Sequence, residues 1–320
     1  MAVTVGIPRA LLYYQYYPAW EAFFRTLGAE IVLSAETSKS ILNQGVRLAV
    51  EEACLPVKLF LGHVADLRDK GVDMLFIPRI VSVEAKKYFC PKFLGLPEIV
   101  RCCVSGLPEI LSPEINIAKK PVRTRVEICR LAARFDRRPW VIDRALAAAN
   151  EAHAAYKKLL QSGCTPQEAL DGGRQACREG KIRVAVLGHV YNVNDNYFNC
   201  NLLAKLREME VEIVTVEMLP AEAFACGGKW LEKESFWSFG HELLGAGCFL
   251  LQEKSVQGLI LVAAFGCGPD SLICELLARY YKRSSSIPVL LLTLDEHSGE
   301  AGLVTRLEAF IDMLRRREAV

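Results

Sequence analysis

Short apolar runs alternate along this chain with segments in which apolar residues recur at helical spacing. Runs with the length and composition of buried strands occur at 3–7, 30–34, 73–80, 184–188, 212–216, 258–265 and 287–294. Helical patterns lie between or after these runs, at 19–28, 38–52, 57–69 and 299–317. Strands that alternate with helices are typical of parallel sheets, so the pattern predicts an α/β fold.

One long helical segment interrupts the alternation. Residues 119–180 contain several arginines and an alanine-rich stretch with helical spacing. We therefore expect two Rossmann-like, doubly wound parallel-sheet domains, at 1–118 and 181–320, joined by a helical connector at 119–180. Ligands of such sheets bind at the carboxyl ends of the strands, often between domains.

Charge and hydropathy narrow the classes of function. The chain has 320 residues, of which 52% are hydrophobic, and a formal net charge of +2. This balance and the lack of a recognition motif argue against nucleic acid as a partner. The first residues lack the basic region and cleavage site of a signal peptide, and the apolar runs are shorter than the roughly 18 residues of a membrane span. We expect a cytoplasmic protein without membrane contact.

The chain contains 12 cysteines, and none of them stands in a CxxC motif. Cytosolic reductants keep thiols reduced, which argues against disulfides. The lack of CxxC pairs excludes the usual zinc-ribbon and thioredoxin signatures. Reactive, buried or scattered metal-binding cysteines remain as the alternatives.

We single out three cysteines that lie one or two residues before a proline, a spacing that Cys164, which we expect to be structural, also has. They are Cys54 in EEACLPVK, Cys90 in YFCPKFLGLP and Cys267 in AAFGCGPDS. Proline is favoured in the first turn of a helix, so the sequence predicts helix starts at Pro56, Pro91 and Pro269. At a helix N-terminus, unpaired N–H groups and the positive end of the dipole favour a thiolate and a negatively charged metal centre.

The alternative interpretation is that a buried cysteine is a small apolar core residue. It fits Cys274, which has helical spacing with neighbouring leucines, and we also expect structural roles for Cys129, Cys164 and Cys177. It fits the three proline-associated cysteines less well, because glycine and proline mark loops. The roles of four others stay open: Cys102, Cys103, Cys200 and Cys226.

Three thiolates suit a cubane cluster with one open iron. A 4Fe–4S cluster usually has four cysteine ligands, so a site with three leaves one iron accessible to water or substrate. Zinc is the competing ion, since it accepts three cysteines plus a histidine or water. The candidate fourth ligands are His63, His189 and His297.

The stretch GCGPDSL at 266–272 also resembles a nucleotide-binding loop. Two glycines follow a predicted strand and precede a predicted helix. However, Ser271 stands where the third glycine belongs, and the chain has no P-loop motif. We do not expect this chain to hydrolyse ATP by itself.

Two polar clusters follow predicted strands of the second domain, GHVYNVND at 188–195 and LDEHSGEAG at 294–302. They supply our candidate catalytic residues, which are His189, Tyr191, Asn192, Glu296 and His297, with Asp195 beside them. Such groups form hydrogen bonds or transfer protons next to a metal centre. Helix capping and turn formation explain the Asn and Asp residues equally well.

A basic segment opens the predicted connector. Its cations are Lys119, Lys120, Arg123, Arg125, Arg130, Arg134, Arg137 and Arg138. They have the charge to dock an acidic activator protein or the phosphates of coenzyme A. A solvated helix face is the simpler interpretation.

Several of these motifs together resemble a known family. They are GIPRALLYYQYYPAWEAFFRTLG, EEACLPVK, FIPRIVSVE, YFCPKFLGLP, LGHVYNVND, FGCGPDSL and DEHSGEAGLVTRLEAF. They are similar to relatives of 2-hydroxyacyl-CoA dehydratase subunits, a module found fused to, or near, acyl-CoA dehydratase activases in anaerobes. The likeness spans most of the chain and extends, more distantly, to the dehydratase component itself and to double-cubane cluster proteins.

The resemblance implies an oxygen-sensitive cluster held between two Rossmann-like domains, with Cys54, Cys90 and Cys267 as its ligands. It also implies an ATP-hydrolysing iron–sulfur activator that supplies low-potential electrons, and a related subunit or a second copy of the chain as a partner. A double-cubane (8Fe–9S) cluster needs about six thiolates. The four open cysteines lack the loop context of the first three, so we expect one 4Fe–4S cluster per chain.

Two classes of function follow from this resemblance. In the first, the chain is an enzyme component whose open iron takes part in the reduction or radical dehydration of a small molecule. In the second, it is a non-catalytic cluster carrier or assembly partner, or a zinc-binding protein with three cysteine ligands. The cysteine contexts differ from those of characterised dehydratase subunits, so their substrates are not carried over.

Overall fold

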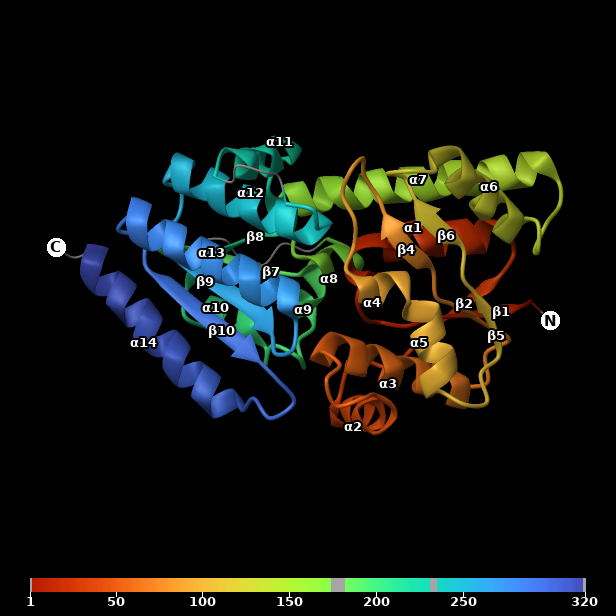
Figure 1. The fold of residues 1–320 in the computed structure, drawn as a ribbon, viewed down its shortest axis with the longest axis horizontal. Helices are drawn as coiled ribbons and strands as arrows, with labels where there is room; N and C mark the ends of the chain where they lie inside the picture. Colours follow the sequence, from red (N-terminus) through yellow and green to blue (C-terminus); the bar gives the residue numbers. More distant parts are fainter. Residues whose placement is uncertain (1, 174–181, 231–234, 319–320) are drawn as a thin grey trace. The chain divides into compact units, whose positions relative to one another are not determined.

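The structure is a computed structural model that describes residues 2–173, 182–230 and 235–318 (Figure 1). The chain forms two compact units. Unit 1 comprises Met1–Lys158 together with Phe236–Ser238, and unit 2 comprises Leu159–Ser235 and Phe239–Val320. Cys177 and the end of the predicted connector lie outside the described residues.

Unit 1 is built on a four-stranded parallel sheet with the order β2-β1-β3-β5. Its strands are β1 (Thr4–Ile7), β2 (Glu30–Leu33), β3 (Met74–Phe76) and β5 (Glu109–Leu111). A separate parallel pair joins β4 (Arg79–Ser82) to β6 (Glu114–Asn116). The single strand predicted over 73–80 is divided into β3 and β4 around Pro78, because proline lacks the N–H that a continuous ladder requires.

The helices of unit 1 cover both faces of its sheet (Figure 1). They are α1 (Tyr13–Thr26), α2 (Lys39–Leu48), α3 (Leu55–Asp69), α4 (Pro91–Leu94), α5 (Leu96–Cys103), α6 (Pro121–Ala132) and α7 (Pro139–Gln161). Phe24 of α1, Leu131 of α6 and Ala145 of α7 share one core with Val5 and Phe76 of the sheet. Helix α6 and most of α7, both in the predicted connector, therefore belong to unit 1.

Helices α2 and α3 cross at short range because of two glycines. A Cβ atom on Gly45 would overlap the carbonyl oxygen of Lys58, and a Cβ atom on Gly62 would overlap that of Ile41. Most side chains of α3 are buried, and Cys54 directly precedes its first residue. The two glycines therefore hold in place the helix that begins after Cys54.

We expect Gly45→Ala to lower the free energy of unfolding by about 2 kcal/mol, because a methyl group forces the two helices apart. Gly95→Ala is the matched control in the same unit. Its new Cβ would lie 3.5 Å from the Pro91 carbonyl oxygen, an ordinary contact, so we expect a change of about 0.5 kcal/mol or less. Urea titration of both variants measures the difference, and equal effects would contradict the close crossing.

His63 on α3 is fully buried and has a hydroxyl group on each side of its ring. Ser34 Oγ lies 2.8 Å from Nδ1, and Thr37 Oγ1 lies 3.0 Å from Nε2. Burial lowers the pKa of His63 to about 4, against a smaller opposing effect of Asp66. The neutral ring is therefore a hydrogen-bonding residue of the core, with both nitrogens occupied.

This low pKa makes folding depend on pH. Between pH 6.5, the ordinary pKa of histidine, and about 4, the unfolded chain binds a proton at His63 that the folded chain does not. Stability therefore falls as the pH falls, by about 2 kcal/mol from pH 7 to pH 5 for this residue. Urea titrations at the two pH values should show a smaller pH dependence for His63→Gln; the same dependence in both proteins would refute this assignment.

Unit 2 contains a second parallel sheet, with the order β10-β9-β7-β8. Its strands are β7 (Ile182–Gly188), β8 (Val211–Thr215), β9 (Gly258–Ala264) and β10 (Val289–Leu294), each within two residues of its predicted ends. In both units the first strand lies inside the sheet, with the second strand on one side and the third on the other. The two sheets confirm the predicted pair of Rossmann-like units.

Helices also cover both faces of the second sheet. They are α8 (Pro166–Leu170), α9 (Val190–Asn194), α10 (Leu202–Glu208), α11 (Ala221–Phe224), α12 (Ser238–Glu253), α13 (Gly268–Ser284) and α14 (Glu300–Glu318), with 3-10 turns η1 (Val216–Met218) and η2 (Ala225–Lys229). Leu259 and Leu261 of β9 pack with α12 and α13, whereas Gly258 lies against Phe310 and Leu314 of α14. Within the described ranges, no helix has both the length and the apolarity to cross a membrane.

Candidate functional site

The three proline-associated cysteines all occupy helix N-caps, as the sequence predicts. Cys54 precedes α3, Cys90 precedes α4 and Cys267 precedes α13, and a proline stands in the first turn of each helix. The carbonyl oxygens of Cys54, Cys90 and Cys267 accept the first helical hydrogen bonds, at 3.0–3.1 Å. None of the three side chains accepts a hydrogen bond from its helix, unlike the usual Ser, Thr or Asp cap. Each thiol is half-buried.

The loop before Cys90 is held by a short segment from much later in the chain. Tyr88 pairs with Trp237 in a parallel bridge, donates its N–H to the Phe236 carbonyl and accepts from Ser238 N–H, both at 3.0 Å. Its ring stacks on that of Phe236 with centroids 4.9 Å apart. These contacts explain why residues 236–238 belong to unit 1, and they fix the backbone two residues before Cys90.

In unit 2, Cys267 lies at the point where the winding of the sheet reverses. Strands β7 and β9 are neighbours, and the chain leaves them toward opposite sides of the sheet. Doubly wound sheets bind ligands at the carboxyl ends of such strands. His189 follows β7 directly, and Cys267 follows β9 after a turn in which Gly266 has a φ of +77°, a conformation that favours glycine.

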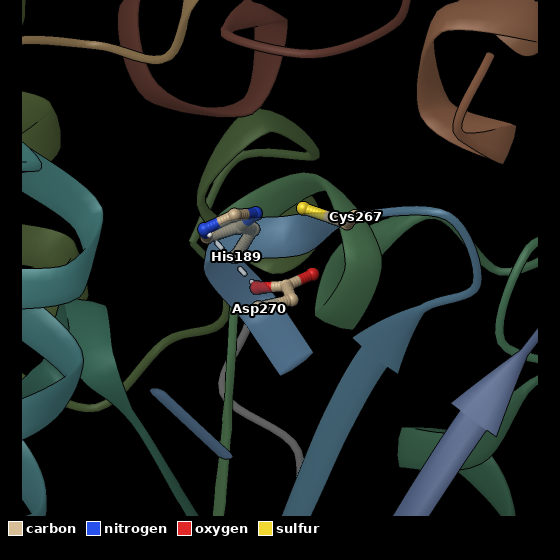
Figure 2. A group of neighbouring side chains, drawn as sticks. All are labelled: His189, Cys267 and Asp270. Atoms are coloured by element: carbon tan, nitrogen blue, oxygen red, sulfur yellow. Dashed lines mark ion pairs between the residues drawn. The ribbon is translucent and has the colours of Figure 1, made fainter. Parts of the chain in front are cut away.

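Figure 2 shows His189, Cys267 and Asp270 together at this edge. One donor atom from each of the three lies within 4.8 Å of the others. Asp270 is the third residue of α13 and is completely buried, and its Oδ1 lies 3.1 Å from His189 Nε2. The edge of the sheet therefore combines a thiol, an imidazole and a carboxylate in one group, which we call the Asp270 group.

The two oxygens of Asp270 differ in their partners. Oδ2 accepts hydrogen bonds from Asn192 Nδ2 at 2.9 Å and from the Ala264 N–H at 3.2 Å. Oδ1 lies 3.1 Å from His189 Nε2, but no donor of the described chain is aligned with it for a hydrogen bond. A buried carboxylate oxygen without a hydrogen bond is rare in folded proteins and is often explained by a water or an ion.

The His189 ring is packed between polar and aromatic neighbours. Tyr191 OH lies 2.7 Å from Nδ1, and the Phe239 ring centroid lies 4.6 Å from that of His189. Burial lowers the pKa of His189, and the Asp270 carboxylate opposes part of this shift. Because Asp270 faces Nε2, we assign the proton of the neutral ring to that nitrogen, so that Nδ1 accepts from Tyr191.

The structure brings together three of the five predicted catalytic residues. His189, Tyr191 and Asn192 meet around Asp270. Glu296 and His297 lie in the turn after β10, where the His297 N–H donates to Asp295 Oδ1 at 2.9 Å, and they are not members of the Asp270 group. Asp195 caps a turn by accepting from the backbone N–H groups of Tyr197 and Phe198.

The remaining cysteines fall into several environments. Cys274 is buried in the core of unit 2, which confirms its predicted structural role, and Cys164 is also buried. Cys226 and Cys248 are buried with their sulfur atoms 2.8 Å apart, beside Gln252. Cys102 is exposed and Cys103 half-buried at the end of α5, and Cys129 is half-buried on α6. Burial raises the pKa of Cys200, which lies before α10.

Asp270 is the residue of the site that the sequence analysis did not select. The stretch GCGPDSL resembles a glycine-rich nucleotide loop, a pattern in which the aspartate has no assigned role. An acidic residue in the first turn after a proline is common at a helix start, where it favours the dipole. The sequence feature that points to Asp270 is its spacing of three residues from Cys267, which places both side chains near the N-terminus of one helix.

The fold and the site define a protein of two parallel α/β units, with a histidine, a cysteine and an aspartate grouped at the switch point of the second unit. The chain belongs to the family described as the CoA enzyme activase uncharacterised domain, whose sequence profile matches residues 4–219. The match covers more than half of the chain and includes Cys54, Cys90 and His189. Cys267 and Asp270 lie beyond its end.

Comparisons with solved structures and with curated proteins give no further information about the function of the chain. A crystal structure of a putative phosphosugar isomerase from Bacillus subtilis is 12% identical, with 99% of this chain and 88% of that chain covered, but its TM-score is only 0.23. No curated protein matches the chain. Membership of the activase-related family links the chain to the CoA enzyme activase system and goes no further.

Proposed function

We propose that the chain binds a 4Fe–4S cluster through Cys54, Cys90 and Cys267 and serves as an iron–sulfur component of an activase-linked reaction on a small substrate. The observation that carries the proposal is the shared setting of the three cysteines. Each is a half-buried N-cap residue before a helix that starts with a proline-containing turn. The activase-related family is consistent with this assignment.

The residues present fit such a cluster in their chemistry. Thiolates are the usual ligands of iron–sulfur clusters, and helix N-termini stabilise negative charge. No N-cap side chain competes for the first-turn N–H groups of α3 or α13. When bound, a cluster with three cysteine ligands supplies one iron that is accessible to a ligand.

The neighbours of Cys267 supply the proton chemistry in this proposal. Tyr191, His189 and Asp270 form a line of hydrogen-bonding and charged groups that ends beside Cys267. The neutral His189 accepts a hydrogen bond from Tyr191 OH at Nδ1, while its Nε2–H faces the Asp270 carboxylate. Asn192 keeps Asp270 in position, and Glu296 and His297 remain proposed catalytic residues from the neighbouring strand end.

Low-potential electrons come, in this proposal, from an ATP-hydrolysing iron–sulfur activator protein. The basic segment is our candidate docking surface, although much of its charge is already neutralised. Arg130 pairs with Glu127 at 3.1 Å, Arg138 with Asp136 at 2.6 Å, and Arg134 with Glu109. Arg125 and Arg137 are exposed, and they are the cations to test.

We expect the double variant Arg125→Glu and Arg137→Glu to bind the purified activator at least about tenfold more weakly at low salt, because charge reversal opposes electrostatic steering. The difference should shrink as salt is added. Lys157→Glu, an exposed lysine on α7 outside the segment, is the control. Unchanged binding by the double variant would exclude the segment as a docking surface.

A second candidate is a zinc site made by the Asp270 group alone. It is favoured by the orphaned Asp270 Oδ1 and by the grouping of one nitrogen, one sulfur and one oxygen donor within 4.8 Å. Zinc accepts this mixture of ligands and keeps an open position in catalytic sites. In this alternative Cys54 and Cys90 are not ligands.

Electron paramagnetic resonance of the reduced, anaerobically purified protein tests the open iron. We expect a signal of a 4Fe–4S cluster that changes when cyanide is added, because cyanide binds an accessible iron. A cluster signal that cyanide leaves unchanged would contradict the three-cysteine ligand set. A protein without any such signal that contains zinc would favour the second candidate.

A further inference from the structure

Unit 1 contains a partly open apolar cavity of about 240 Å³ that the proposed function does not use. It lies between α1, α6, α7 and the two-stranded sheet of β4 and β6. Its wall includes Tyr16, Trp20 and Phe23 of α1, Ile80 of β4, Ile115 of β6 and Ala149 of α7. A smaller cavity of about 50 Å³ adjoins it and shares Tyr16, Trp20 and Ile80.

This amount of space is informative because protein interiors are packed almost as densely as organic crystals. An apolar cavity of about 150 Å³ stays dry and accommodates a benzene molecule. The cavity in unit 1 is larger and is lined by three aromatic rings. It therefore has room for one aromatic ring with a short substituent.

The polar features of the cavity are few and carry no charge. Among the residues that the structure describes, no Lys, Arg, Asp or Glu contributes to its lining, in which His153 and Asn150 of α7 are the main polar residues. The His153 ring stacks on Tyr16, with centroids 5.5 Å apart, and its buried Nδ1 has no hydrogen-bond partner in the described structure. Burial lowers the pKa of His153, assisted by Lys157, so the ring is neutral near pH 7.

We propose that this cavity binds a small, uncharged aromatic molecule with a single ring and one hydroxyl group. The ring occupies the space beside Tyr16, Trp20 and Phe23, where edge-to-face contacts are available. The hydroxyl group lies at the polar end of the cavity, where Asn150 and His153 contribute to the lining. A ligand whose charge would lie inside the cavity is disfavoured, because the lining offers no opposite charge to offset its desolvation.

Calorimetric titration with three ligands that share an ethylbenzene skeleton tests the proposal: 4-ethylphenol, ethylbenzene and 4-ethylbenzoate. We expect 4-ethylphenol to bind with a Kd on the order of 0.1–1 mM, which suits a ligand of this size. Ethylbenzene should bind about tenfold more weakly, since it lacks the hydroxyl group. The carboxylate should not bind measurably.

Three substitutions test the location of the site and its polar end. Ala149→Leu fills the cavity and should abolish binding, whereas Ala154→Leu, at an exposed position of the same helix, should leave it unchanged. His153→Phe should remove the preference for 4-ethylphenol over ethylbenzene. Thermal melting reports whether each variant is folded.

The proposal is overturned if 4-ethylphenol does not bind, or if the two alanine variants affect binding equally. If Ala149→Leu does not fold, the His153→Phe variant becomes the deciding test. If this variant still binds 4-ethylphenol more tightly than ethylbenzene, the proposal is contradicted. None of these residues belongs to the cysteine set or to the Asp270 group. Loss of the cluster in other variants therefore leaves this test unaffected.

Discussion

The Cys54→Ser variant, purified without oxygen, is expected to lose most of its iron and acid-labile sulfide. The reason is that serine is a poor ligand for iron–sulfur clusters, so a site with three thiolates loses a third of its protein ligands. Cys90→Ser and Cys267→Ser should have the same effect. Metal analysis and the visible spectrum of each variant measure the loss.

Controls for this experiment come from cysteines in the same units. Cys129→Ser in unit 1 and Cys274→Ser in unit 2 change thiols that we assign to structural roles, and both should keep their iron. Cys54→Ser also separates the two candidate sites, because the zinc alternative places no ligand in unit 1. Metal retained in Cys54→Ser but lost in Cys267→Ser would contradict the cluster and support the Asp270 group.

Replacing Asp270 by alanine is expected to cost about 3–5 kcal/mol of stability in unit 2. The carboxylate is completely buried and holds Asn192, the Ala264 N–H and His189. Removing it leaves these partners buried and unsatisfied, which is the costly way to break such a network. Urea unfolding gives the total change, and hydrogen exchange of peptides from β9 and α13 shows where it acts.

Substitutions at Asp270 and at the adjacent Ser271 show how much the Asp270 carboxylate contributes to stability. Asp270→Asn keeps the size of the side chain and an acceptor oxygen, so we expect a smaller loss than for alanine. Ser271→Ala removes the exposed hydroxyl that donates to the Cys267 carbonyl at 2.9 Å, and we expect a change of about 0.5 kcal/mol or less. A cost for Asp270→Ala no larger than that of Ser271→Ala would refute the buried network.

The strands and the three helix starts could be predicted because each depends on local chemistry. The apolar runs around β7 and β9 are buried on both faces, and proline in a first turn marks a helix start wherever it occurs. The same local information does not show which strands are neighbours. The proximity of His189 and Asp270, which are far apart in sequence, follows only from the pairing of β7 with β9.

Other features depend on packing that no local pattern records. The amphipathic helices α6 and α7 look like a connector in sequence, yet they complete the core around Phe24. The aromatic cavity is lined by five different elements, and its polar end is formed by Asn150 and His153, which belong to no recognisable motif. Asp270 was overlooked because an acidic residue at a helix start has an ordinary explanation.

The most direct test of the central claim is the metal content of the anaerobically purified chain. Iron, zinc and acid-labile sulfide should be measured on one sample. The proposal predicts about four irons and four sulfides per chain, with little zinc. Zinc in the absence of sulfide would contradict it and would assign the metal to His189, Cys267 and Asp270.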